Sequence, residues 1–468
     1  MRFPLLAKTA AIGGVLLALM FALQSVTGIV AEREGRLREA ERGVADSLAT
    51  QQVLLGPVLR RACVERWTSL QGEGKERKAL EQRREFTLAA TPASLDVAAR
   101  AVIEPRHRGI FRVNGYTVHA TLRARWANLA ALQPQPEHAG SATACEVPEL
   151  FVAVGDARGI RNVGISVAGH ALAPLPGTGH ASHPRGFHAV IGVAQEAGQP
   201  LDADVTLDLA GTGALSFAPV GDATTASLSS DWPHPSFAGR FLPDERTVTD
   251  TGFNATWRLS ALATSAAREL LNGGPVCGLE PDAPAAASPN ARHAACIETF
   301  GVGFIDPVSG YVLSDRATKY GLLFIALTFV GVGLVEVLKR LRVHPVQYLL
   351  VGSALALFFL LLVSLTEHIA FAAAYLCAAS ACTLLLTFYA SFVLGGARTG
   401  VAFGAAMSAL YGALYLLLQL EQSALVLGAV LLFVVLAAVM VTTRRVDWYT
   451  LIERLRRDAV LAAGKPTQ

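Results

Sequence analysis

Two patterns of apolar residues divide the chain. Six segments are almost continuously apolar, and each is close to the ~20 residues that a helix needs to cross a lipid bilayer. These segments are residues 9–30, 320–337, 347–365, 369–394, 400–419 and 423–442. Between the first two, short alternating runs are separated by Gly, Pro and Asp, as in antiparallel strands. The pattern predicts a membrane protein with six transmembrane α-helices and a large antiparallel β-rich domain, either sandwich-like or an elongated twisted sheet.

The first apolar segment follows Arg2 and Lys8, and such a basic flank begins both cleaved signal peptides and uncleaved signal anchors. The segment is long for the apolar region of a signal peptide, and no clean A-x-A cleavage site follows it. We therefore expect residues 9–30 to remain as an uncleaved signal anchor.

Basic residues mark one side of the membrane, since Lys and Arg are enriched in short cytoplasmic loops. They gather after the second span, at Arg398 after the fourth, and after the last. Both termini are therefore predicted to be cytoplasmic, although this topology places Arg316 and Lys319 outside. The predicted boundaries are a cytoplasmic N-terminus at 1–8, helix 1 at 9–30, an exported periplasmic domain at 31–317, helices 2–6 at 318–443 and a cytoplasmic tail at 444–468.

The composition agrees with a membrane protein, since 52% of residues are hydrophobic, 16% are charged and the mean hydropathy is +0.41. A formal net charge of +3 is too small to indicate a nucleic-acid partner. We expect no cofactor, and membrane lipids are the partners that the spans imply.

The exported region holds an even number of cysteines, which favours two disulfides in an oxidising compartment. Four cysteines allow three pairings. We favour Cys277–Cys296, which closes a loop of Pro, Ala and Gly, and Cys63 and Cys145 are the other candidates.

Local signals suggest two further features of the exported region. Charges after the first span recur at helical spacing, which predicts a helix that continues out of the membrane and ends at Gly56-Pro57, where proline breaks it. This helix is read as a stalk, and a partner-binding helix is the alternative. Asn114-Gly115 lies between two alternating runs and is a candidate hairpin turn.

The stretch SSDWPHPSFAGRFLP, residues 229–243, combines rigid and aromatic residues. The prolines on both sides of His234 favour extended backbone. The structural interpretation is a corner held by Trp232, and the functional one is a surface that presents Trp232, His234 and Arg240 to a glycan, lipid head group or protein. A serine hydrolase centred on Ser236 is the weakest alternative, because no nucleophile elbow is present.

Charged candidates occur at two other places. In VGDARGI, Asp156 is expected to accept backbone N–H groups and to pair with Arg158, and anion capture by Arg158 is the alternative. Before the second span, Asp315 is expected to cap the helix while Arg316 and Lys319 reach lipid phosphates.

Four histidines of one loop region suggest a metal site, but no matching carboxylate or cysteine completes a tetrahedral set. They are His170, His180, His183 and His188. We expect no metal.

Several strings together resemble one family. They are VGDARGI, GTG at 211–213, WPHPSFAGRFLP, GFNATW at 252–257, SDRATKYGLLFIALTF at 314–329, the segment from His344 to His368, and RRVDWY at 444–449. In this order they resemble the CreD family of bacterial inner-membrane proteins, described as cell envelope integrity proteins. The resemblance implies association with a two-component regulon, envelope integrity and colicin tolerance. It implies no enzymatic reaction.

The predicted function is therefore non-enzymatic: maintenance or sensing of the cell envelope from the inner membrane, through a binding surface on the periplasmic domain. Its partner there would be an envelope component or a protein. A transporter or lipid-handling protein whose periplasmic domain receives cargo is the alternative from another class. An envelope hydrolase is the third.

Overall fold

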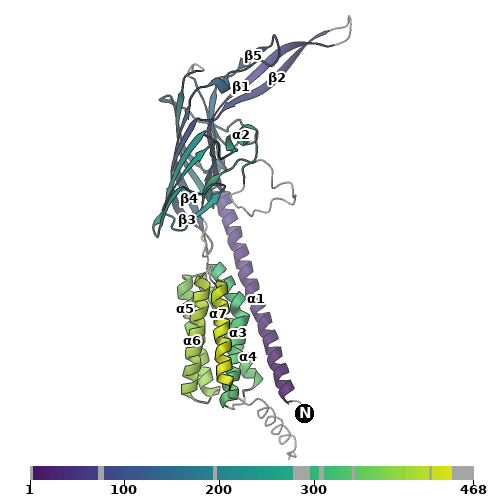
Figure 1. Cartoon of the computed structure of the whole chain (residues 1–468), viewed down its shortest axis with the longest axis vertical. Helices are drawn as coiled ribbons and strands as arrows, with labels where there is room; N and C mark the ends of the chain where they lie inside the picture. Colours follow the sequence, from purple (N-terminus) through teal and green to yellow (C-terminus); the bar gives the residue numbers. More distant parts are fainter. Residues whose placement is uncertain are drawn as a thin grey trace, which may run out of the picture. The chain divides into compact units, whose positions relative to one another are not determined.

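The computed structural model describes residues 4–71, 78–192, 198–277, 296–304, 310–339, 343–393, 395–420 and 424–444. The chain divides into two compact units, one made of residues 1–38 and 308–468 and the other of residues 39–307. Helix α1 (Pro4–Ser47) runs without a break through the end of the first unit into the second (Figure 1).

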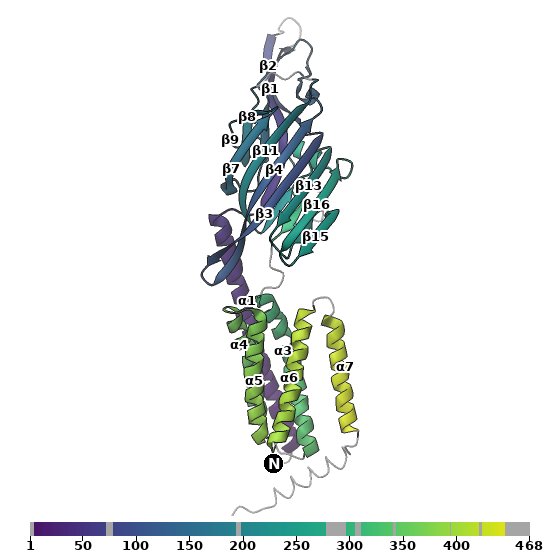
Figure 2. The same ribbon diagram turned by 90° about the vertical axis from the view of Figure 1, so that its left-hand side faces the viewer.

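The membrane unit contains the apolar helices. After α1 come α3 (Gly310–Lys339), α4 (Pro345–Thr366), α5 (Phe371–Val393), α6 (Ala397–Gln419) and α7 (Ala424–Thr443). Six helices in the described residues are long and apolar enough to cross a membrane, which confirms the six predicted spans. Figure 2 shows α5, α6 and α7 lengthwise.

Aromatic rings and close helix approaches fill the interior of the membrane unit. The Tyr411 ring lies 4.6 Å from that of Phe358 and 4.7 Å from that of Phe324. A Cβ added at Gly404 would lie 2.1 Å from the Thr387 hydroxyl, so α5 and α6 can approach closely only because this position lacks a side chain.

The β-rich unit, residues 39–307, contains two β-sheets. The nine-stranded sheet has the order β14-β17-β12-β1-β6-β10-β9, with β2 and β5 also paired to β1. Its strands are β1 (Gln52–Gln71), β2 (Lys78–Ala90), β5 (Ala142–Cys145), β6 (Glu149–Ala153), β9 (Leu175–Pro176), β10 (Gly186–Val190), β12 (Ala214–Phe217), β14 (Ser236–Gly239) and β17 (Phe300–Gly303). Strands β1 and β2 extend as an arm beyond the rest of the unit (Figure 1).

The eight-stranded sheet has the order β15-β16-β13-β3-β4-β11-β7-β8 (Figure 2). Its strands are β3 (Ser94–Arg108), β4 (Phe111–Trp126), β7 (Ile160–Val167), β8 (His170–Leu172), β11 (Leu201–Thr212), β13 (Ala223–Ser230), β15 (Glu245–Thr249) and β16 (Gly252–Ser260). A short helix, α2 (Ala266–Leu271), follows β16.

Side chains from both sheets form one continuous core, because alternate residues of each strand face inwards. Along β3, for example, Leu95, Val97, Ala99 and Ala101 are buried while the residues between them are exposed. The predicted β-rich class is confirmed, and the sheets are mixed rather than purely antiparallel, because β1 pairs in parallel with β12 and β3 in parallel with β13.

Two local predictions were wrong. Helix α1 ends at Ser47, and Gly56-Pro57 lies within β1, where the pairing register with β6 shifts between Leu55 and Val58. A register shift tolerates proline, which cannot donate to the ladder.

The second error concerns the hairpin between β3 and β4. It turns at Gly109 and Ile110, whereas Asn114-Gly115 is inside β4. Gly115 is needed there for a packing reason, because an added Cβ would come within 3.1 Å of the Leu48 side chain.

Candidate functional site

Asp156 and Arg158 tie the end of α1 to the eight-stranded sheet. Asp156 precedes the short 3₁₀ turn η3 (Ala157–Gly159), and its carboxylate accepts from the Thr50 backbone N–H at 3.0 Å and from Arg158 Nε at 3.0 Å. Arg158 Nη1 also donates to the carbonyl of Asp46 in the last turn of α1. The pair therefore binds the chain at the end of α1 and in the short segment between α1 and β1.

The Asp156 carboxylate is both buried and ion-paired with Arg158. The Asp156 side chain is 8% exposed. Hydrogen bonds from Arg158 hold the pKa of the Asp156 carboxyl well below its ordinary value, against the opposing effect of burial. Since the Arg158 guanidinium already binds this carboxylate and a helix carbonyl, the geometry matches the pairing interpretation rather than anion capture.

The stretch at 229–243 folds its own corner. The Trp232 indole N–H donates to the His234 carbonyl at 2.7 Å, and the two rings meet edge to face at 6.1 Å between centroids. Trp232 is buried, His234 is exposed, and the Asp231 carboxylate fixes the segment to the backbone N–H of Ile103. Arg240 follows β14 with an exposed side chain, and its backbone N–H donates to Thr299. The structure therefore brings Trp232 and His234 together but not Arg240.

The charged residues near the second span lie inside a helix. Because α3 begins at Gly310, Asp315 does not cap it, and that expectation was wrong. Asp315 instead accepts from Lys319, one turn later, at 2.6 Å. Arg316 lies on the same helix, half-buried.

Two of the four candidate histidines contact backbone carbonyls through a ring nitrogen. His188 Nδ1 lies 2.6 Å from the Gly177 carbonyl, and His183 Nε2 lies 2.9 Å from the Gly274 carbonyl. Within the described part of the chain, no three His, Cys, Asp or Glu side chains come together as metal ligands.

All four cysteines of the β-rich unit are paired. Cys277 bonds to Cys296, as favoured from the sequence, and Cys63 on β1 bonds to Cys145 on β5. The second disulfide fixes β5 at the point where the arm leaves the sheet, beside the cavity described next.

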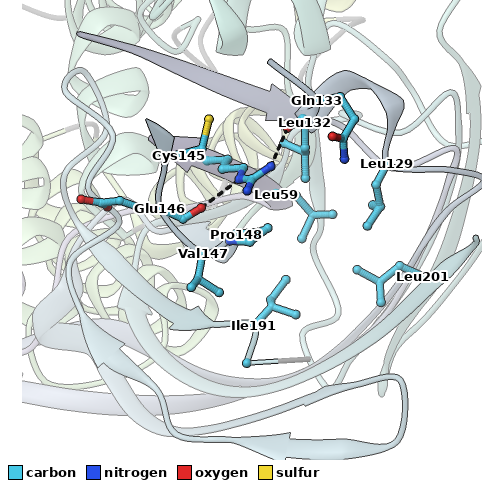
Figure 3. A pocket seen from close by; sticks show the side chains of 12 residues that line it. Leu59, Leu129, Leu132, Gln133, Cys145, Glu146, Val147, Pro148, Ile191 and Leu201 are labelled. Carbon is cyan, nitrogen blue, oxygen red and sulfur yellow. Dashed lines mark hydrogen bonds between the residues drawn. The ribbon is translucent and has the colours of Figure 1, made fainter. Parts of the chain in front are cut away.

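A half-open cavity of about 380 Å³ lies at the end of the sandwich, next to the arm. Figure 3 shows aliphatic side chains around it from four separate parts of the chain. They are Leu59 of β1, Leu129 and Leu132 around the turn after β4, Val147 and Pro148 between β5 and β6, Ile191 after β10, and Leu201 at the start of β11. The polar residues Arg61, Gln133 and Glu146 complete the lining, so the site missed by sequence reasoning is a recess of mixed aliphatic and polar character.

Arg61 is the cation that lines this cavity. Its Nε donates to the Glu146 carbonyl at 2.8 Å, and its Nη1 lies 3.4 Å from the Leu132 carbonyl. Its neighbour Arg60 pairs with the Glu149 carboxylate, whereas Arg61 has no carboxylate within ion-pair distance among the described residues. The guanidinium is thus positioned by two neutral groups.

A buried glutamate fixes the loop that carries one wall of the cavity. The Glu65 side chain is fully buried, and its Oε1 accepts from the backbone N–H groups of Glu137 and His138 and from the Ser141 hydroxyl. The Ser141 hydrogen bond is the main cause of a lowered Glu65 pKa. The His138 ring also stacks on Trp67 at 3.8 Å. The loop after Leu132 is therefore anchored to β1.

Comparison with known proteins decides the family. The model of the family "Inner membrane protein CreD" matches residues 4–449. The chain belongs to the CreD family. It is 34% identical over 452 residues to the inner membrane protein CreD of Escherichia coli strain K12, and the match covers 96% of this chain and 95% of that protein. It is therefore a multi-pass inner-membrane protein.

Solved structures add nothing to the CreD assignment. The M1 zinc metallopeptidase of Deinococcus radiodurans and a variant of it match 36% of this chain and 38% of theirs, at 12% and 11% identity. Their TM-scores are 0.18 and 0.19, too low to carry any conclusion about fold or activity.

The cavity of this CreD-family protein has no local signature in the sequence. Its walls come from residues up to 142 positions apart, Leu59 and Leu201 being the extremes, and each aliphatic residue alone is indistinguishable from ordinary core. The one available signal is Arg61, a charged residue on the same face of β1 as Leu59 and Cys63, which are both buried.

Proposed function

We propose that this protein supports cell-envelope integrity without catalysing a reaction, by binding an envelope component on its exported domain. The observation that carries the proposal is the half-open cavity with Arg61 in its lining. Its volume lies within the ~300–1,000 Å³ that is usual for small-molecule sites. A recess that combines aliphatic side chains with a few polar groups, here Arg61, Gln133 and Glu146, is the usual form of a binding site.

The topology that the proposal requires is N-in and C-in, with residues 39–307 in the periplasm. The clustering of Lys and Arg after the second, fourth and sixth spans supports it. The two disulfides in this unit suit an oxidising compartment.

The rival function is transport or lipid handling through the spans. The aromatic cluster of Phe324, Phe358 and Tyr411 favours an anchor, because it occupies the interior of the helix bundle with closely spaced rings. A hydrolase is also disfavoured: among the described residues, no hydrogen bond joins Ser236 to a base.

The proposal is tested by blocking the cavity in the full-length protein. Val147 lines the cavity and is 52% exposed, so Val147→Trp adds bulk there without entering the core. Val248→Trp is the matched control, because Val248 is 48% exposed on β15, in the other sheet. A strain lacking the gene is complemented with each variant, and survival under envelope stress and membrane abundance are measured together.

We expect Val147→Trp to abolish complementation at normal abundance while Val248→Trp complements fully. His234→Ala should also complement, because the hydrogen bond from the Trp232 indole to the His234 backbone carbonyl is kept and only the ring contact is lost. Full complementation by Val147→Trp at normal abundance would refute a binding role for the cavity.

A further inference from the structure

The cavity walls indicate the chemistry of the part of a ligand that enters. Leu59, Leu132, Ile191 and Leu201 form a buried aliphatic floor, and Val147 and Pro148 are the more exposed aliphatic residues of the lining. Among the described residues, no aromatic ring lines the recess. Aliphatic walls interact with hydrocarbon mainly through the exclusion of water and offer no hydrogen-bond partner. The entering part is therefore hydrocarbon.

Arg61 indicates the chemistry of the part that stays outside. A guanidinium carries five N–H donors, and two of those of Arg61 are used by the carbonyls of Glu146 and Leu132. The two N–H groups of Nη2 and one of Nη1 have no partner among the described residues. This edge suits a carboxylate or phosphate, which guanidinium groups bind in bidentate fashion.

The backbone around the cavity argues against an extended peptide as occupant. The Glu146 N–H donates to the Ala62 carbonyl, and the Ile191 N–H donates to the Pro148 carbonyl. Strand β10 pairs with β6 from Gly186 to Val190 and with β9 at Phe187 and His188. A peptide added as a strand needs unpaired backbone groups, and the N–H groups of Glu146 and Ile191 are already used.

From the lining and the guanidinium together, we propose that the cavity binds a single-chain anionic amphiphile, with its hydrocarbon chain against Val147 and Pro148 and its head group on Arg61. The volume, at the small end of the usual range, suits one chain rather than two. This inference rests on the proposed binding function and names its ligand class. Fatty carboxylates and single-chain phosphates share the required chemistry.

The test is photo-crosslinking in full-length protein held in lipid nanodiscs. The probe is decanoic acid that carries a diazirine near its chain end, and labelled peptides are located by mass spectrometry. We expect labelling of the segments that contain Leu132 and Leu201. Excess decanoate or decyl phosphate should compete, whereas decyltrimethylammonium should not, and the more effective of the two anions identifies the head group.

Two variants separate the head-group contact from general effects of charge. Arg61→Gln should reduce labelling of these segments about 10-fold or more, because it removes a charge-assisted pair. Arg66→Gln removes the same charge from the same strand at a position outside the cavity lining, and should label like the parent. Equal labelling of the Arg61→Gln and parent proteins, or equal competition by the cationic amphiphile, would overturn the proposal.

The outcomes also distinguish this inference from the proposed function. If Val147→Trp abolishes complementation but no label reaches the cavity, the domain binds something other than an anionic amphiphile. Stronger competition by an apolar peptide than by decanoate would likewise replace the ligand class. If the label reaches the cavity and Val147→Trp still complements, the binding is real and the proposed role in the envelope fails.

Discussion

Two arginines of the β-rich unit each donate to a backbone carbonyl and differ in one respect. Arg158 donates to the Asp46 carbonyl in the last turn of α1, and Arg61 donates to the Glu146 carbonyl between β5 and β6. Arg158 also binds the buried carboxylate of Asp156, whereas Arg61 has no carboxylate within ion-pair distance among the described residues. An arginine that is paired with a buried carboxylate stabilises the fold. An arginine that is held in place by backbone carbonyls, without an ion-pair partner, is available to an anionic ligand.

The difference explains why the more conspicuous motif is the less promising site. VGDARGI attracts attention because an acid and a base stand together between glycines, and that same proximity satisfies both charges. Arg61 lies in an ordinary strand, and its isolation becomes evident only when the loop at 133–141 and the segment at 146–148 are in place around it.

Among the substitutions that test the contrast between Arg158 and Arg61, Asp156→Ala is expected to have the largest effect on the free energy of unfolding. Asp156→Ala leaves the Thr50 and Arg158 N–H donors without their acceptor, which should cost about 3 kcal/mol in the free energy of unfolding. Four of the chain's five tryptophans lie in the β-rich unit, so tryptophan fluorescence during thermal or denaturant unfolding of the full-length protein reports mainly on this unit.

The control for this change is Asp250→Ala, an exposed acid in the turn between β15 and β16. It should leave the unfolding midpoint nearly unchanged. If both variants unfolded at the same temperature, Asp156 would not contribute to the stability of the fold.

Much of the architecture follows from the sequence because length and alternation report directly on burial. Uninterrupted apolar runs give the six spans, and period-two patterns give strands such as Ser94–Arg108. Prediction failed where tertiary contacts override local signals. Gly115 resembles a turn residue but makes room for Leu48, and Pro57 resembles a helix end but occupies an irregularity in β1.

The candidate site was less predictable than the fold. Pairing of Asp156 with Arg158 could be expected because they are two residues apart in a glycine-rich turn. The cavity could not, because its lining is assembled from four segments and its distinguishing property is a missing partner. An absence of compensating charge is a property of three-dimensional neighbours, and no single sequence conveys it.

A second, smaller effect concerns pH. The Asp156 and Glu65 pKa values are both lowered in the folded protein, mainly by hydrogen bonds from Arg158 and Ser141 respectively. The unfolded state therefore binds protons more readily, so the stabilisation is fully present above the ordinary carboxyl pKa of ~4 and is lost as pH falls through the lower folded values.

We accordingly expect the unfolding temperature of the β-rich unit to fall progressively below about pH 5. Asp156→Asn and Glu65→Gln should each flatten this acid branch, whereas Arg61→Gln should leave its slope unchanged. Identical acid branches in the Asp156→Asn variant and the parent would contradict the assignment of this carboxylate as a stabilising group.

The smallest effect on stability is expected for Arg61→Gln. This variant also gives the clearest distinction between Arg61 and Arg158. Arg61→Gln removes an exposed hydrogen bond to the Glu146 carbonyl and a long contact of 3.4 Å to the Leu132 carbonyl, so the unfolding free energy should change by less than about 1 kcal/mol. A ligand that binds only the folded state raises the unfolding temperature. Decanoate should therefore stabilise the parent and the Arg66→Gln control in fluorescence-detected melts, but not Arg61→Gln.

An Arg61→Gln variant that is as stable as the parent and yet insensitive to decanoate would show that the Arg61 guanidinium serves binding. A large loss of stability in Asp156→Ala would show that the Asp156–Arg158 pair serves folding. If Arg61→Gln instead lowered stability as much as Asp156→Ala, the two arginines would be equivalent structural groups and the distinction between them would disappear.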